Sequence, residues 1–164
     1  MIRIGNLLGA IAVLVAVECY LRPSEVLGLR RSGLLPPTQQ GVPHWVVLLF
    51  PDAGVERSKV GSSDDTIPLD SRRMPWIGAV CQSLAVGPPE EKVFKQDYPA
   101  FARSFKVAAR ALGIDLVPYQ MRHSGASLDR AKGLRTLEAT QKRGRWTSLA
   151  SVRRYEKHGR LNDT

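Results

Sequence analysis

The segment PYQMRHSGASLDRA occupies residues 118–131 and is predicted to form a short helix. Two further short helices are predicted over residues 135–143 and 148–157. Gly133 and Gly144 separate the three segments, because glycine interrupts a helical pattern. The last quarter of the chain is therefore expected to be helical.

A small antiparallel sheet is predicted earlier in the chain, between helical blocks. Residues 31–44 contain two glycines and two consecutive prolines, which predicts a loop. Runs rich in β-branched and aromatic residues then predict strands, and Pro68 favours a sheet edge. The strands are expected over residues 45–50, 55–60 and 66–69, and the helices around them over residues 24–30, 72–85 and 98–112. The expected fold class is mainly α with a small antiparallel β-sheet (α+β).

Residues 4–21 form a mostly apolar run, IGNLLGAIAVLVAVECYL, that allows three interpretations. A buried helix is favoured, with Pro23 opening the next helix, since proline suits a first helical turn. A secretory signal peptide is the second interpretation, with Arg3 as its short basic region. A membrane span is the third and weakest, because it needs about 20 apolar residues and Asn6 and Glu18 interrupt this run.

Composition and charge favour an anionic partner. The chain has 164 residues, of which 43% are hydrophobic and 24% are charged, enough for one domain with a sizeable core. Its formal net charge is +9, and 11 of its 24 lysines and arginines fall within residues 119–160, where only three acidic residues occur. Nucleic acid and an anionic membrane surface are the two kinds of partner that such a charge favours.

The two cysteines, Cys19 and Cys81, lie far apart in apolar surroundings. So few cysteines argue against a disulfide framework or a cysteine-based zinc site, and they favour a reducing compartment. No cluster of cysteine and histidine has metal-ligand spacing. No metal and no cofactor are therefore expected.

Several short motifs follow one another along the chain. They are RPSEVLGLR (22–30), SKV (58–60), YQMRHSGAS (119–127), GRWTS (144–148) and VRRY (152–155). Each is weak alone, but their order and their predicted structural context make the combination specific. Together they resemble the catalytic domain of tyrosine recombinases, the phage integrase family. The resemblance runs from about Leu7 to His158 and covers nearly the whole chain.

The resemblance implies site-specific recombination or integration of DNA, with Tyr155 as the nucleophile and a 3′-phosphotyrosyl intermediate. The guanidinium groups of Arg22 and Arg122 are expected to hold the non-bridging phosphate oxygens, whose negative charge grows in the transition state. Lys59 is expected to protonate the 5′ oxygen that leaves. Because the phosphotyrosine keeps the bond energy, rejoining requires neither ATP nor a metal.

Two positions depart from the commonest family pattern. Tyr119 stands where the family usually has a histidine. A phenol there can hydrogen-bond the phosphate or Tyr155, but it does not readily accept a proton at neutral pH. Trp146 stands where histidine is common and tryptophan is the known alternative, and its indole N–H can donate to a phosphate oxygen. Both side chains are therefore counted with the expected catalytic residues.

Basic and supporting residues surround these positions in the sequence. The residues expected to contact DNA are Lys142, Arg143, Arg145, Arg153 and Arg154. The alternatives for the run at 142–145 are a solvated basic face and a cluster that resembles a nuclear-localisation signal. Glu25 and His123 are expected to support the site, and His123 is expected to be a buried structural histidine beside it.

The resemblance also implies an organisation and partners. Residues 1–164 are expected to form a single catalytic domain that lacks the N-terminal core-binding domain of family members, with only nine residues after Tyr155. DNA is the expected partner, with self-association on DNA, which gives a tetrameric synapse in the family, and no membrane. The expected location is intracellular: the nucleus in a eukaryote, or the cytoplasm and nucleoid in a bacterium.

Two other functions stay open on the sequence. One is a catalytically inactive DNA-binding remnant of a mobile-element recombinase, with the same fold. The other is a signal-bearing or membrane-associated basic protein, which the apolar run at 4–21 allows.

Overall fold

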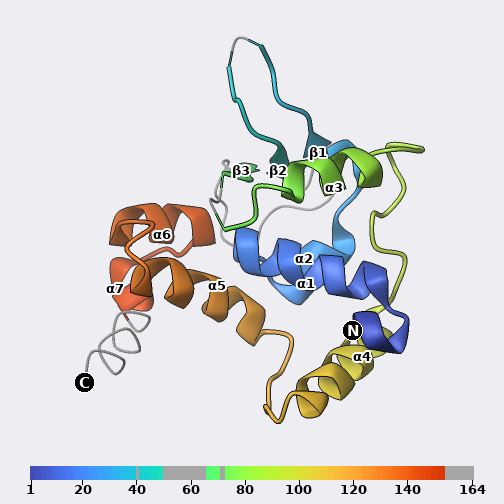
Figure 1. Ribbon diagram of the computed structural model, residues 1–164. Helices are drawn as coiled ribbons and strands as arrows, with labels where there is room; N and C mark the ends of the chain where they lie inside the picture. The colour runs from blue at the N-terminus through green and yellow to red at the C-terminus, as the bar shows by residue number, and fades with distance from the viewer. Residues whose placement is uncertain (40, 50–65, 71–72, 154–164) are drawn as a thin grey trace. The chain divides into compact units, whose positions relative to one another are not determined.

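The computed structural model describes residues 1–39, 41–49, 66–70 and 73–153. The chain divides into two compact units: unit 1 combines Met1–Val26 with Gln96–Thr164, and unit 2 covers Leu27–Lys95. Unit 1 is helical, and the small sheet lies in unit 2 (Figure 1). The expected α+β class, mainly helical with a small antiparallel sheet, is confirmed. That residues 1–164 form one catalytic domain stays a prediction.

In unit 1, α5 (Gln120–Ala131) packs against two other helices. Helix α1 (Leu7–Cys19) packs against α5 and also contacts α4 (Tyr98–Ala111), while α6 (Leu137–Gly144) packs against both α5 and α7 (Leu149–Val152) (Figure 1). A 3₁₀ turn, η1 (Ile2–Ile4), precedes α1, and α2 (Pro23–Gly28) follows it. Helix α5 is therefore in contact with helices from both ends of the sequence.

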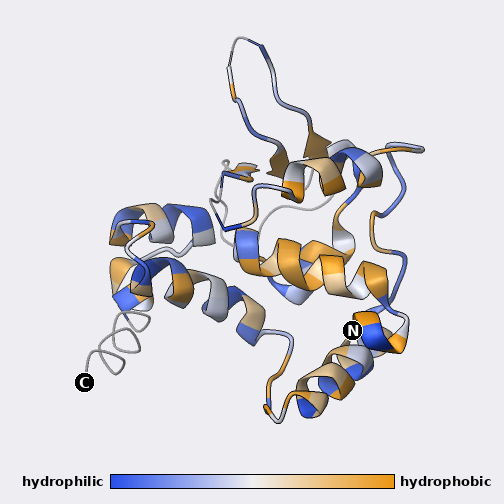
Figure 2. Ribbon diagram, viewed as in Figure 1, coloured by the Kyte–Doolittle hydropathy of each residue, from blue (hydrophilic) through white to orange (hydrophobic). Residues whose placement is uncertain are grey.

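Helix α1 is largely buried, as the favoured interpretation of the apolar run predicts. It begins after Asn6, whose side-chain oxygen accepts a hydrogen bond from the N–H of Gly9 at 2.8 Å. Ala12, Val15 and Ala16 are buried in the core, and Figure 2 shows apolar colour along most of the helix. Among the described residues, no helix is long and apolar enough to cross a membrane.

Helices α1 and α5 approach each other closely at Gly125. A Cβ atom at this position would lie 2.0 Å from the carbonyl oxygen of Val17 and 2.8 Å from Cδ1 of Tyr20. No side chain fits into that space without moving the backbone of α1. The glycine in the segment YQMRHSGAS is therefore explained by helix packing.

Helix α4, predicted over 98–112, is confirmed. Asp97 caps its first turn by accepting a hydrogen bond from the N–H of Ala100 at 2.7 Å. Phe101 and Phe105 are buried on one face, and the helix shows both colours in Figure 2. An amphipathic helix of this kind owes its position to the burial of its apolar face.

The three helices predicted in the last quarter are also present. Helix α5 lies within the predicted range 118–131, and α6 matches the range 135–143 after a cap by Thr136, which accepts from the N–H of Ala139 at 3.1 Å. Helix α7 follows Ser148 as expected. The end of the helix predicted over 148–157 lies outside the described residues.

Unit 2 holds three short antiparallel strands in the order β1 (Leu34–Leu35), β2 (Val46–Leu48), β3 (Thr66–Pro68). Leu34 pairs with Val47, and Val47 pairs with Ile67. These three side chains are buried, which fixes the register of the sheet. Helix α3 (Ile77–Leu84) follows the sheet, and a short 3₁₀ turn, η2 (Arg31–Gly33), precedes it.

Two details of unit 2 differ from the sequence-based prediction. Residues 31–44 were predicted as a loop, but Leu34–Leu35 forms β1 because it pairs with β2, a partner that local sequence does not reveal. Helix α3 begins at Ile77, later than the predicted residue 72, because Pro75 disfavours a helical conformation at Met74. Pro68 lies in β3, an edge strand of the described sheet, as predicted. The strand predicted over 55–60 lies outside the described residues.

Candidate functional site

Three arginine side chains of unit 1 surround the carboxylate of Glu25. Nη1 of Arg22 lies 2.8 Å from Oε1 of Glu25. Nη2 of Arg145 lies 2.7 Å from Oε2, and Nη1 of Arg122 lies 3.8 Å from the same oxygen. These four residues are called the Glu25 cluster below. Arg22 and Arg122, which were predicted to act on one phosphate, thus converge on one carboxylate although they are far apart in the sequence.

Each member of the cluster comes from a helix end. Arg22 directly precedes α2, and its backbone N–H donates to Oε2 of Glu25, in the first turn of that helix, at 2.6 Å. This contact resembles the reciprocal half of a capping box, in which a glutamate bonds back to the N–H of the capping residue. Arg122 lies in the first turn of α5, and Arg145 is the residue that ends α6.

The cluster carries a net charge of +2, because three guanidinium groups share one carboxylate. Burial alone raises the pKa of Glu25, but Arg145, the backbone N–H of Arg22 and Arg122 together hold that pKa below its usual value. Burial, together with the positive charges of Arg22 and Arg145, lowers the pKa of Arg122 to about 10, against an opposing effect of Glu25. Both groups are therefore ionised at neutral pH.

Arg122 is the most enclosed member of the cluster, with 1% of its surface exposed. Its Nη1 donates to the carbonyl oxygen of Tyr20 at 2.8 Å, and its Nη2 donates to the carbonyl of Gly144. These carbonyls lie at the C-terminal ends of α1 and α6, where carbonyl groups lack partners within their own helix and the helix dipole favours a cation. Arg122 therefore joins the two helix ends. Its Nε has no hydrogen-bond partner among the described residues.

The indole ring of Trp146 packs beside the Arg122 guanidinium. The guanidinium carbon of Arg122 is 4.7 Å from the centroid of the indole ring, a cation–π distance. The ring also packs on Tyr20, with centroids 6.1 Å apart. A Cβ atom at Gly144 would lie 1.8 Å from this ring, so glycine leaves the space that Trp146 occupies. The predicted catalytic positions Arg122 and Trp146 are thus in direct contact.

Tyr119 is 47% exposed at the start of α5. Its ring makes an edge-to-face contact with the ring of His123, with centroids 5.0 Å apart. The phenol is close enough to Arg122 to raise the pKa of that arginine slightly, although burial has the larger and opposite effect. His123, expected to be a buried structural histidine, is half-buried.

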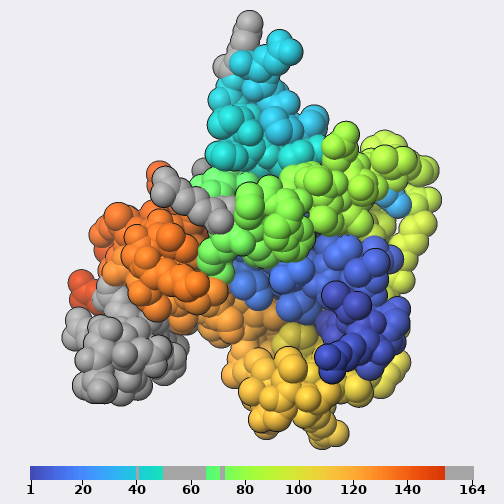
Figure 3. Space-filling model, in the orientation of Figure 1, coloured from blue at the N-terminus to red at the C-terminus, as the bar shows by residue number. Residues whose placement is uncertain are grey.

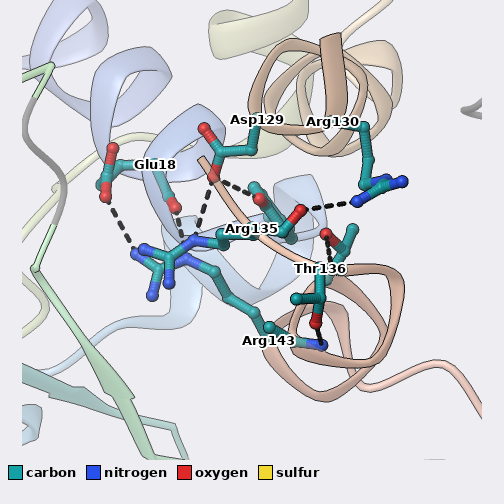
Figure 4. A network of polar contacts seen from close by, with 9 residues as sticks. Glu18, Asp129, Arg130, Arg135, Thr136 and Arg143 are labelled. Atoms are coloured by element: carbon teal, nitrogen blue, oxygen red, sulfur yellow. Dashed lines mark hydrogen bonds and ion pairs between the residues drawn. The ribbon is translucent and has the colours of Figure 1, made fainter. Parts of the chain in front are cut away.

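A second polar network ties α1, α5 and α6 together (Figure 4). Nη2 of Arg143 lies 2.9 Å from Oε1 of Glu18, and its Nε donates to the backbone carbonyl of Glu18 at 3.0 Å. The hydroxyl of Tyr20 donates to Oδ2 of Asp129, which also lies 3.0 Å from Nε of Arg135. Burial, followed by the hydrogen bond to Asp129 and its charge, raises the pKa of Tyr20. This phenol therefore stays protonated at neutral pH.

The positions of Arg143 and Arg145 differ from the predicted DNA-contacting face. Both side chains are buried, Arg143 against Glu18 and Arg145 against Glu25. A buried and paired guanidinium is not presented to a DNA backbone, so these two residues are corrected to internal ion-pair partners. Lys142 and Arg153 are exposed, as a DNA-contacting role requires.

Three predicted residues lie outside the described residues: Lys59, Arg154 and Tyr155. The expected general acid and nucleophile are therefore not placed. What the structure brings together is the Arg22 and Arg122 pair, with Glu25, Arg145 and Trp146.

Sequence reasoning missed the buried network around Glu18 and Asp129. One signal was available, because a glutamate inside a long apolar run is expensive to bury without a cation. Its partner, Arg143, lies far away in the sequence, and nothing local identifies it. Arg145 was predicted to contact DNA, and its pairing with Glu25 was not foreseen.

Unit 1 also contains an apolar cavity of about 730 Å³. Residues of η1, α1, α4 and α5 line it, including Ile4, Leu14, Phe105 and Met121. Figure 3 shows the residues of η1, in dark blue, beside those of α4, in yellow. The cavity belongs to a different part of unit 1 from the Glu25 cluster, with which it shares no residue.

No family model matches the chain, and no significant similarity is found to curated proteins or to solved structures.

Proposed function

We propose that this chain binds DNA and cleaves and rejoins its strands as a tyrosine recombinase. One observation carries the proposal: the arginines predicted to hold one phosphate, Arg22 and Arg122, converge on the carboxylate of Glu25. Local folding does not dictate this convergence, because the two arginines come from separate segments of unit 1. The surplus positive charge of the cluster suits a phosphodiester.

In the proposed reaction, the phenol of Tyr155 loses its proton to water, its Oη forms a bond to the phosphorus, and the bond from phosphorus to the 5′ oxygen breaks. Lys59 gives a proton to that leaving oxygen. Arg22 supplies direct contacts to the non-bridging oxygens, since 30% of its side chain is exposed. Arg122 adds positive charge behind it, and Trp146 fixes the plane of the Arg122 guanidinium. The product is a 3′-phosphotyrosine and a free 5′ hydroxyl. The 5′ hydroxyl of a second strand then attacks the phosphotyrosine, forms a new phosphodiester and releases Tyr155, whose oxygen takes up a proton.

A catalytically inactive DNA-binding protein is the second candidate, and a specific observation favours it. Both terminal nitrogens of Arg122 donate to backbone carbonyls, and the side chain is almost fully buried. Because the side chain is enclosed, a phosphate reaches the guanidinium only by displacing groups that cover it. DNA binding through exposed basic residues needs no such displacement.

Covalent trapping on nicked DNA separates the two candidates. The substrate is a pool of duplexes with randomised sequence, each carrying one nick. Cleavage near the nick releases a short DNA fragment that diffuses away. Its 5′ hydroxyl is then no longer present to attack the phosphotyrosine, so the covalent adduct accumulates. The wild-type chain is expected to give a DNA adduct stable to denaturation, and Tyr155→Phe is expected to give none. Tyr98→Phe is the matched control, because Tyr98 is an exposed phenol on α4, away from the cluster.

Absence of an adduct with the wild-type chain, in the presence of measurable DNA binding, supports the inactive candidate. An adduct that persists in Tyr155→Phe contradicts the proposed nucleophile.

A further inference from the structure

Arg145 has a backbone conformation that arginine rarely adopts. Its φ of 53° and ψ of 42° lie in the left-handed region, at the residue that ends α6. Glycine is the usual residue at such a helix end, because it has no Cβ to collide with the following carbonyl. Strain of this kind persists where surrounding contacts hold it in place, and it occurs most often at functional sites.

The side chain of Arg145 is also in an unfavourable environment for a charge. It is buried, with 4% of the side chain exposed. Its Nη2 lies 2.7 Å from Oε2 of Glu25, while its Nη1 has no hydrogen-bond partner among the described residues. A strained backbone and a desolvated, partly unsatisfied guanidinium both oppose folding, so packing gives no reason for arginine at this position.

We propose that Arg145 is a positioning residue that sets the charge of the Glu25 cluster for binding a phosphate group. By holding Oε2 of Glu25, it keeps that carboxylate from neutralising Arg122. The cluster then offers a net positive charge of two to a phosphate that arrives at Arg22, its solvent-exposed member. This inference rests on the proposed function in one respect, which is that the phosphate group belongs to a DNA phosphodiester.

The distances within the cluster support this role. Oε1 of Glu25 is occupied by Nη1 of Arg22 at 2.8 Å, and Oε2 is shared by the N–H of Arg22 and by Arg145. Arg122 stays at 3.8 Å from Oε2, beyond hydrogen-bond distance. Without Arg145, Oε2 is open to a direct pair with Arg122, and the cluster falls to a net charge of one. The positive potential at Arg22 falls with it.

Inorganic phosphate is a suitable probe, because it tests the cluster without requiring DNA cleavage. The midpoint of thermal unfolding is measured against phosphate concentration, with sodium chloride at matched ionic strength as the reference. Arg145→Gly removes the charge and places the favoured residue in the left-handed position, so the fold is expected to survive. The wild-type midpoint is expected to rise with phosphate, and Arg145→Gly is expected to bind phosphate about tenfold more weakly or worse.

Arg145→Lys and Arg145→Gln form a matched pair of similar length that differs in charge. Arg145→Lys is expected to retain most of the phosphate dependence, and Arg145→Gln is expected to lose it. This pair decides the question if Arg145→Gly does not fold. If Arg145 had a purely structural role, each substitution would change the unfolding midpoint by the same amount with and without phosphate.

Two results overturn the proposal. One is equal phosphate affinity in the wild-type chain and in the uncharged variants. The other is a wild-type chain that phosphate does not stabilise beyond matched sodium chloride. Neither result decides the proposed function, which is tested separately by covalent trapping on DNA. Equally, a failure of trapping leaves the phosphate measurement and its interpretation intact.

Discussion

At the scale of single residues, Glu25 connects the parts of the candidate site. Its carboxylate accepts from the backbone and side chain of Arg22 and from Arg145, and lies 3.8 Å from Arg122. The family resemblance of the segment that begins at Arg22 implied that Glu25 supports the site. It did not predict Arg145, because that contact joins helix ends that are far apart along the chain.

The first prediction concerns the pH dependence that Glu25 confers. Its pKa in the folded chain lies below the ordinary value of 4.5. Its ionised form therefore stabilises the fold above that pH, and this stabilisation is lost as the pH falls through the folded-state pKa. Glu25→Gln has no such titration. The difference in free energy of unfolding between wild type and variant is expected to be constant above about pH 6 and to shrink below about pH 4.5.

Urea unfolding of both proteins across this pH range measures the difference directly. Glu138→Gln is the control, since Glu138 is an exposed carboxylate of α6. A difference between wild type and Glu25→Gln that does not change with pH would contradict the ion pairs assigned to Glu25.

The second prediction concerns the buried pair of Glu18 and Arg143. Replacing Arg143 by methionine leaves the Glu18 carboxylate buried without its main cation, and the expected loss is about 3–5 kcal/mol of unfolding free energy. The double variant, with Glu18→Leu added to Arg143→Met, is expected to regain most of the lost unfolding free energy, because an apolar pair needs no compensating charge. Chemical denaturation of the wild-type chain and the two variants tests this, and a double variant as unstable as the single one would count against the pair.

At the scale of secondary-structure elements, local sequence predicted the helices well and the sheet less well. Helix α4 follows from its cap at Asp97 and its apolar face, both of which are local signals. Strand β1 was predicted as part of a loop, because its pairing with β2 joins segments that are apart in the sequence. The close contact between α1 and α5 was also invisible in the sequence, where Gly125 is one residue of a motif.

The third prediction concerns that contact. In an isolated helix, Gly→Ala stabilises by about 1 kcal/mol, because alanine has the higher helix propensity. At Gly125 the sign is expected to reverse, with a loss of about 1–3 kcal/mol, since the new Cβ meets the Val17 carbonyl. Ser124→Ala, at an exposed position of the same helix, serves as the control and is expected to be neutral or slightly stabilising. Thermal unfolding of both variants measures the signs, and stabilisation by Gly125→Ala would disprove the close packing.

At the scale of the whole molecule, the net charge of +9 favours an anionic partner, but the structure divides the basic residues into two groups. Arg143 and Arg145 are buried and form internal ion pairs with Glu18 and Glu25. Lys142 and Arg153 are exposed. Composition predicted the charge and its location in the last quarter of the chain. Composition did not distinguish buried from exposed arginines, because the burial of an arginine depends on which carboxylates pack against it in the folded chain.

The fourth prediction follows from this division. If DNA phosphates contact Lys142 and Arg153, the double variant Lys142→Gln, Arg153→Gln loses two contacts, and the slope of log affinity against log salt is expected to become shallower by about 1.8. Lys106→Gln, an exposed lysine on α4, is expected to leave the slope unchanged. Filter binding between low and moderate salt measures all three slopes. A slope that is the same in wild type and double variant would remove these residues from the DNA interface.

The central claim is that Arg22, Arg122 and Tyr155 act on a single phosphorus atom. An experimental structure of the full chain with bound orthovanadate, an analogue of the five-coordinate phosphorus, tests it most directly. We predict a vanadate whose oxygens accept hydrogen bonds from Arg22, at about 3 Å, with Oη of Tyr155 in line and within about 3–3.5 Å of the vanadium. A vanadate bound at the Glu25 cluster with the phenol of Tyr155 far from it, or a vanadate bound elsewhere, would contradict the claim.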